Sequence, residues 1–147
     1  FGAGGVGLNI VQAAALMTAY PIIAVDVFDN RLELARQLGA THLINARNTD
    51  PKVAIREIAG ARGVDAFIDN TGQPSIIQLG YELTGPQGRV TLVGVPRKGN
   101  NTTIYSFFWF KNVYGPIKSI FIPIANTPIN RYTYNRLVRP FRLEYWC

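Results

Sequence analysis

The feature that most constrains this chain is a run of glycines at its start. Residues 2–7, Gly-Ala-Gly-Gly-Val-Gly, match the pattern G-x-G-x-x-G. Gly2 permits a tight turn, Gly4 lets the backbone approach a phosphate without a Cβ in the way, and Gly7 lets a following helix pack close to a sheet. The start of that helix offers free N–H groups and the positive end of its dipole. The run therefore predicts a turn that binds a phosphate or pyrophosphate, formed by Gly2, Gly4, Gly5, Val6 and Gly7.

An acidic residue at a fixed distance narrows the ligand to a dinucleotide. The apolar stretch 22–25 is typical of a buried parallel strand, and it ends at Asp26, which lies 19 positions after Gly7. A carboxylate there accepts hydrogen bonds from adenosine ribose hydroxyls and repels a phosphorylated ribose, which favours NAD over NADP. Arg31 is placed to reach the ribose or the adenine rim. The alternatives are a strand-end turn residue for Asp26 and a solvated helix residue for Arg31.

Helical and strand patterns alternate along the first two thirds of the chain. Helices are expected at 6–20, 30–38, 50–59 and 74–83, and strands at 22–25, 42–44, 64–68 and 89–93. Gly39 is expected to end the second helix, and Asp50 with Pro51 to begin the third. The first helix is apolar nearly all round, which predicts that it is buried. The alternation predicts an α/β fold, a doubly wound parallel sheet of the Rossmann type.

Two later strand ends carry residues that suit the same ligand. The third strand runs into Thr71 and Gly72, and the fourth into Gly94 and Val95. Ligands of doubly wound sheets lie beyond the carboxyl ends of the strands, so both segments face the crevice at the glycine turn. Gly72 and Gly94 let a flat ring approach the backbone, unless they are ordinary loop glycines.

Composition excludes several other classes of protein. With 147 residues, 48% of them hydrophobic and 16% charged, the chain suits one globular domain. No apolar run is long enough to span a membrane. One cysteine, Cys147, and one histidine, His42, cannot form a structural zinc site. The net charge of +6 is dispersed rather than clustered, which argues against nucleic-acid binding.

The chain resembles the cofactor domain of the medium-chain dehydrogenase/reductase family, the zinc-type alcohol dehydrogenases. The resemblance extends from Gly2 to about Pro96 and rests on GAGGVG, AVDVFDNRLELARQLGATHLIN, GVDAFIDNTGQP and GRVTLVGVP. It implies that Gly4, Gly5 and Val6 contact the pyrophosphate and the nicotinamide side, and that Asp26 and Arg31 hold the adenosine ribose. By the same resemblance Thr71 and Gly72 line the adenine side, and the backbone of Val93, Gly94 and Val95 meets the nicotinamide carboxamide.

The resemblance also implies parts that this sequence does not contain. The family moves hydride between an alcohol carbon and NAD, with zinc polarising the oxygen. Its zinc ligands belong to a preceding domain, and its strand before the glycine turn is represented here only by Phe1. The expectation is thus a Rossmann domain over residues 1–103 with its first strand missing, and an irregular tail over 104–147. No catalytic residue and no metal ligand is assigned within the chain.

The implied full-length protein is a cytoplasmic homo-oligomer that acts on an alcohol or aldehyde. A dinucleotide-binding module without catalysis uses the same residues and stays open, as do a methyltransferase and, less favoured, a basic nucleic-acid binder. His42 is interpreted as structural, and Cys147 has no neighbouring base that would make it a nucleophile. The aromatic run 107–110 is expected to be buried or to face another subunit.

Overall fold

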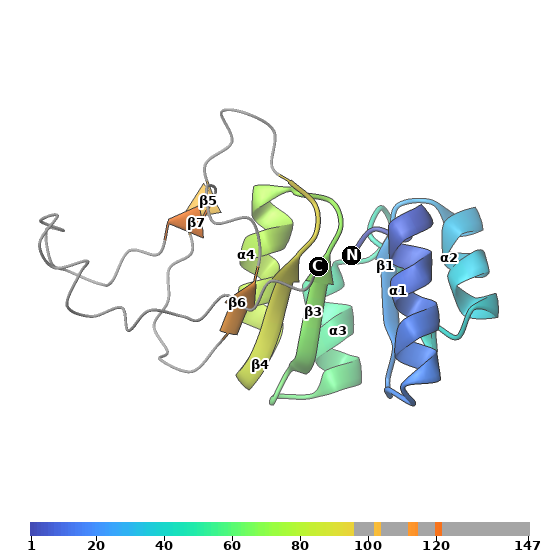
Figure 1. Cartoon of the computed structure of the whole chain (residues 1–147), viewed down its shortest axis with the longest axis horizontal. Coiled ribbons are helices and arrows are strands. Elements are labelled where there is room, and N and C mark those ends of the chain that lie inside the picture. Colours follow the sequence, from blue (N-terminus) through green and yellow to red (C-terminus); the bar gives the residue numbers. More distant parts are fainter. Residues whose placement is uncertain (96–101, 104–111, 115–119, 122–147) are drawn as a thin grey trace, which may run out of the picture.

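Helices and strands alternate along the chain as far as Leu92 (Figure 1). The computed structural model describes residues 1–95, 102–103, 112–114 and 120–121. The helices are α1 Gly5–Leu16, α2 Asp29–Gln37, α3 Pro51–Ala59 and α4 Pro74–Leu83. The strands are β1 Ile23–Asp26, β2 His42–Asn45, β3 Val64–Asp69, β4 Thr84–Leu92, β5 Thr102–Thr103, β6 Asn112–Tyr114 and β7 Ile120–Phe121.

Every described strand pair is parallel. β1 pairs with β2, with Ile23 opposite His42. β4 lies between β3 and β6, so that Val90 is opposite Phe67 on one side and Val113 on the other. β5 and β7 form a separate pair. The parallel strand pairing that the alternating pattern predicted is confirmed, although β1 and β2 form one sheet and β3, β4 and β6 form another.

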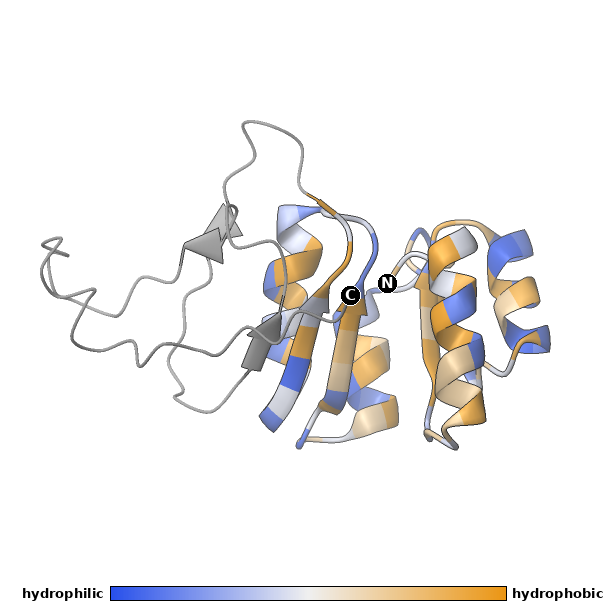
Figure 2. Ribbon diagram, viewed as in Figure 1, coloured by the Kyte–Doolittle hydropathy of each residue, from blue (hydrophilic) through white to orange (hydrophobic). Residues whose placement is uncertain are grey.

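Helices cover both faces of β1, since neighbouring residues of this strand belong to different hydrophobic clusters. Val25 of β1 belongs to a cluster built with α3, α4 and the strands β2 to β4. Ala24, the preceding residue, belongs to a second cluster built with α1 and α2. The apolar strands lie between these helical layers, as Figure 2 shows. The doubly wound α/β arrangement is thus confirmed.

Three local predictions about helix ends hold. The Asp50 carboxylate accepts a hydrogen bond of 2.8 Å from the N–H of Lys52, and Pro51 occupies the first helical position of α3. Gly39 has a φ of +111°, and the next N–H, that of Ala40, bonds back to Ala35 O at 2.9 Å. A left-handed glycine with this bond ends α2 in the manner expected of a C-terminal cap.

The first helix differs from its prediction in length and in burial. It ends at Leu16 rather than at residue 20, and Thr18 beyond it has a φ of +56°. Only Gly7 and Val11 are buried, whereas Val6 and Leu16 are 57% and 86% exposed. The expected burial of this helix holds for the face that packs against β1 and α2, whereas the opposite face, although apolar, is exposed in the described part of the chain. Strand β4 also begins five residues earlier than predicted, at Thr84 rather than at Arg89.

Several expectations concern segments outside the described residues. They include the aromatic run 107–110 and Cys147. β6 extends the sheet beyond β4, which the sequence pattern did not predict. No helix in the described ranges is both long and apolar enough to cross a bilayer.

The core on the α4 side of the sheet should dominate stability. Ile77 is 1% exposed, and its truncation to alanine leaves a cavity against β3 and β4. We expect Ile77→Ala to lower the free energy of unfolding by about 2–5 kcal/mol, measured by urea denaturation. Leu34→Ala, at a helix position that is 43% exposed, is the matched control and should change it by about 0.5 kcal/mol or less. Equal losses for the two variants would contradict the assignment of the core.

Candidate functional site

The glycine turn is fixed by backbone hydrogen bonds on both of its sides. The N–H of Gly2 donates to Val25 O of β1 at 2.9 Å. On the other side the N–H of Asn70, just after β3, donates to Phe1 O at 3.0 Å, and Asn70 Nδ2 donates to Gly2 O at 3.2 Å. The turn therefore lies between the carboxyl ends of two parallel strands, at the edge where doubly wound sheets bind ligands.

The glycines of the turn are needed for different reasons. Gly2 has a φ of +86°, a conformation that other residues rarely adopt. A Cβ on Gly7 would overlap the carbonyl oxygen of Gly2, so α1 can approach the turn only with glycine there. A Cβ on Gly4 or Gly5 would meet no atom within 4 Å. These two residues thus present open backbone to whatever approaches the turn.

The start of α1 is suited to an anion. Its N-cap residue is Gly4, which supplies no side-chain hydrogen bond, and the first turn contains no acidic residue. The first N–H groups of a helix have no partner within the helix, and the dipole places partial positive charge on them. Val6 in this turn is 57% exposed. The start of α1 therefore offers N–H donors to an anion and contains no acidic residue of its own.

The Asp26 carboxylate accepts several hydrogen bonds from the protein's own backbone. Its Oδ2 accepts a hydrogen bond of 2.7 Å from Ala3 N–H, and its Oδ1 accepts bonds of 2.7 and 3.1 Å from the N–H groups of Val27 and Phe28. A carboxylate has about four lone-pair positions, so about one acceptor position remains, on Oδ2. The side chain is only 4% exposed. Asp26 thus anchors the glycine turn to the end of β1, a role that its spacing did not reveal.

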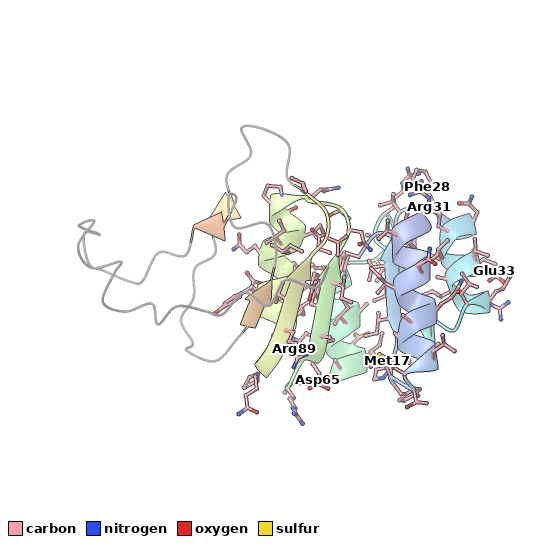
Figure 3. All side chains as sticks on the ribbon, viewed as in Figure 1. Met17, Phe28, Arg31, Glu33, Asp65 and Arg89 are labelled. Atoms are coloured by element: carbon pink, nitrogen blue, oxygen red, sulfur yellow. The ribbon has the colours of Figure 1, made fainter. Side chains whose placement is uncertain are left out.

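Two arginines lie over the Phe28 ring, and one of them, Arg31, is also paired with Asp26. Nη1 of Arg31 lies 3.6 Å from Asp26 Oδ2, and its guanidinium carbon lies 4.7 Å from the centre of the Phe28 ring. Arg47, which follows β2, lies over the same ring at 4.9 Å. Figure 3 shows Phe28 and Arg31 at one end of the strands, with Asp65 and Arg89 at the opposite end. Sequence reasoning missed Phe28 and Arg47, since only the fold brings Arg47 from the next strand.

A second buried carboxylate shapes the loop after β3. Asp69 is 0% exposed, and its Oδ1 accepts bonds of 2.8 and 2.6 Å from the N–H and the hydroxyl of Thr71. Its Oδ2 accepts a bond of 3.0 Å from the N–H of Gly72. These bonds fix the loop that the sequence assigned to the adenine side. Asp69 is a positioning residue that the sequence analysis did not single out.

The residues that follow β4 are hydrogen-bonded to the end of β3, where this loop begins. The N–H groups of Val93 and Gly94 donate to Asp69 O at 2.8 and 2.9 Å. A Cβ on Gly94 would overlap the backbone nitrogen of Gly72, so the close approach requires glycine. Val93 and Val95 are 44% and 67% exposed. The structure therefore brings the predicted segments after β1, β3 and β4 to the edge that carries the glycine turn.

These features fit a dinucleotide better than they fit a metal ion. Open backbone at Gly4 and Gly5 and an uncapped helix start suit a pyrophosphate, and Asp26 retains an acceptor for a sugar hydroxyl. Within the described ranges no three His, Cys, Asp or Glu side chains come together as metal ligands. His42 Nδ1 lies 2.9 Å from the Thr41 hydroxyl, consistent with a structural histidine.

Mutation distinguishes a glycine at which a Cβ would overlap the turn, Gly7, from one at which a Cβ would meet no other atom, Gly4. We expect Gly7→Ala to lower the free energy of unfolding by about 1–3 kcal/mol, because its methyl group overlaps the turn. Gly4→Ala adds a methyl group in open space at an N-cap position and should cost about 1 kcal/mol or less. Urea denaturation of both variants measures the difference, and a larger loss for Gly4→Ala would contradict the geometry of the turn.

Comparison with known proteins places the chain in a family. Residues 5–121 match the family model described as zinc-binding dehydrogenase. Sorbitol dehydrogenase of Bacillus subtilis (strain 168) is 35% identical over 124 residues, which is 77% of this chain and 35% of that protein. The solved benzyl alcohol dehydrogenase of Acinetobacter calcoaceticus is 40% identical with a TM-score of 0.68, covering 78% of this chain and 32% of that one.

A further similar solved structure contains NADP. It is titled as a putative zinc-binding dehydrogenase from Sinorhizobium meliloti 1021, is 28% identical with a TM-score of 0.61, and covers 68% of this chain and 30% of that one. The chain thus spans about a third of the length of such relatives. Since the family model matches well over half of its residues, the chain belongs to the zinc-binding dehydrogenase family.

Proposed function

We propose that this chain forms the NAD-binding part of an alcohol dehydrogenase, in which hydride moves between an alcohol or aldehyde carbon and the nicotinamide ring. One observation carries the proposal. The open backbone at Gly4 and Gly5 is joined through Ala3 to the carboxylate of Asp26, so that a phosphate site and a ribose site share one rigid edge. The relatives are named as dehydrogenases, which supports a redox function over a sensor function.

The proposed placement of the dinucleotide follows the geometry of this edge. The pyrophosphate lies over Gly4, Gly5 and Val6, where α1 begins. The adenosine ribose donates a hydroxyl to the remaining lone pair on Asp26 Oδ2, with Arg31 beside it. The adenine ring lies against Thr71 and Gly72, and the nicotinamide carboxamide meets the backbone at 93–95.

The choice of NAD over NADP depends on whether repulsion by Asp26 exceeds attraction by Arg31 and Arg47. A 2′-phosphate would enter next to the buried carboxylate of Asp26, and like charges held together cost several kcal/mol. Arg31 and Arg47 attract a phosphate, and the Sinorhizobium meliloti relative holds NADP. Both guanidinium groups lie over the Phe28 ring, and the Arg31 side chain is 47% exposed, which weakens its attraction through solvent screening. We therefore assign NAD.

Zinc and the substrate pocket are proposed to lie outside the described residues. Zinc polarises the substrate oxygen when it is bound in enzymes of this kind. The described part of the chain brings together no set of metal ligands, and pockets of two-domain enzymes lie between their domains. This chain's own contribution is to bind, orient and discriminate the cofactor.

Cofactor preference tests the role of Asp26. Calorimetric titration of the chain should show NAD binding about tenfold or more tighter than NADP. Asp26→Asn removes the negative charge and should reduce that preference severalfold or more. Asp29→Asn makes the same charge change at an exposed site three residues away, and it should leave the preference unchanged. Equal affinity of the parent chain for NAD and NADP, or equal effects of the two substitutions, would overturn the assignment.

Cofactor affinity also tests the open face of the turn. A methyl group at residue 4 stands where the pyrophosphate must approach, so Gly4→Ala should weaken NAD binding by about tenfold or more while the chain stays folded. Calorimetry measures the dissociation constant. Undiminished NAD binding in a folded Gly4→Ala chain would place the pyrophosphate elsewhere.

A further inference from the structure

Arg47 lies at the edge that carries the glycine turn, and its charge has no carboxylate partner among the described residues. It follows β2, the strand paired with β1, and its guanidinium carbon lies 4.9 Å from the centre of the Phe28 ring. Within the part of the chain that the structure describes, its side chain forms no ion pair and no hydrogen bond. A guanidinium group in this state is available to pair with an anionic group of a ligand.

The backbone of Arg47 is held in place by its neighbours in the loop after β2. The N–H of Arg47 donates to Asn45 Oδ1 at 2.9 Å, and Asn45 Nδ2 donates to Asp29 Oδ1, at the start of α2, at 2.6 Å. The N–H of the intervening residue, Ala46, donates to Asp26 O at 3.0 Å. These bonds join the loop to α2 and to the end of β1, so the backbone of Arg47 has a fixed position near Asp26.

The Phe28 ring holds two guanidinium groups next to the Asp26 carboxylate. The N–H of Phe28 donates to Asp26 Oδ1 at 3.1 Å, which fixes the backbone of Phe28 beside that carboxylate. Arg31 lies over the ring at 4.7 Å, close to the 4.9 Å of Arg47. A guanidinium group over an aromatic ring keeps the N–H donors of its own plane available, and these donors match the oxygens of a phosphate. Phe28 is 42% exposed, so a group bound beside Asp26 can approach both arginines.

The two arginines differ in what offsets their charge. Nη1 of Arg31 lies 3.6 Å from Asp26 Oδ2, the oxygen to which the proposed ribose hydroxyl bonds. The charge of Arg31 is therefore partly offset by that carboxylate before any ligand arrives. A phosphate on the ribose hydroxyl would be repelled by Asp26, and Arg47 is the cation of this pair that is not already engaged with Asp26. Arg47 is thus better suited than Arg31 to hold such a phosphate.

We propose that Arg47 is the residue that binds the 2′-phosphate of NADP, and that this edge accepts NADP as a second, weaker ligand beside NAD. The inference rests on the proposed function, since it requires the adenosine ribose to lie at Asp26. It goes beyond that function because the preference becomes a balance between residues that follow neighbouring strands. Asp26, at the end of β1, opposes the phosphate, and Arg47, after β2, attracts it.

The exposure of the two charges determines which cofactor binds more tightly. The Asp26 side chain is 4% exposed, so its repulsion of a phosphate is screened little by solvent. Arg47 is exposed, so solvent and salt weaken its attraction. The balance therefore favours NAD in the parent chain. In a chain without the Asp26 charge the repulsion is gone, and the affinity for NADP then depends on Arg47.

Calorimetric titration with NAD and NADP tests the proposal. In the Asp26→Asn chain, Arg47→Gln should weaken NADP binding by about tenfold or more and NAD binding by about twofold or less, because only NADP carries the phosphate. Arg31→Gln should weaken both by similar factors, since Arg31 lies beside the ribose that both cofactors share. Arg89→Gln makes the same charge change at an exposed residue at the opposite end of the strands, and it should alter neither affinity (Figure 3). Arg47→Lys keeps the charge and should retain more NADP affinity than Arg47→Gln.

Several outcomes would overturn the proposal. One is an Arg47→Gln chain with unchanged NADP binding, and another is a chain in which this substitution weakens NAD and NADP equally. A selective loss of NADP that is larger for Arg31→Gln than for Arg47→Gln would assign the phosphate to Arg31 instead. An Asp26→Asn chain that binds NAD but not NADP would also reject the role of Arg47. A parent chain that binds neither cofactor would reject the proposed function and this inference together, whereas each of the other outcomes leaves NAD binding intact and rejects the inference alone.

Discussion

The first two residues of the chain join the end of β1 to the end of β3, and the position of the glycine turn depends on this connection. The backbone of Phe1 and Gly2 is hydrogen-bonded to Val25 on one side and to Ile68 and Asn70 on the other. These bonds bring the ends of β1 and β3 to a common edge and set the glycine turn between them. If they were lost, the phosphate site would no longer have a fixed position relative to the ribose site.

Two buried carboxylates with similar roles organise the edge that carries the glycine turn. Asp26 and Asp69 each stand at a strand end and accept three hydrogen bonds from the turn that follows or faces them. Buried carboxylates are stable only when such donors are present, so each charge is held by the loop that it organises. The same arrangement leaves Gly4 and Gly5 uncovered, and the proposed binding of NAD depends on that exposure.

The sequence predicted what depends on local pattern and spacing. The glycine turn, the strand that ends in Asp26 and the caps at Gly39 and Asp50 all follow from residues close together in the chain, and the structure contains them. The exposed face of α1 could not be predicted from its composition, because burial depends on what lies over a helix. No local sequence pattern predicts the hydrogen bond between Ala3 and Asp26 or the two arginines over Phe28, because these contacts join residues of different elements.

We propose that one edge, formed by the turns after β1 and β3 and by the start of α1, binds NAD. Backbone amide shifts recorded by NMR during a titration with NAD test this proposal most directly. We expect large shifts at Gly4, Gly5, Val27 and Gly72, and small shifts at Thr18 and Gly63, which lie at the opposite ends of the elements. Shifts concentrated at Thr18 and Gly63, with an unchanged glycine turn, would contradict it.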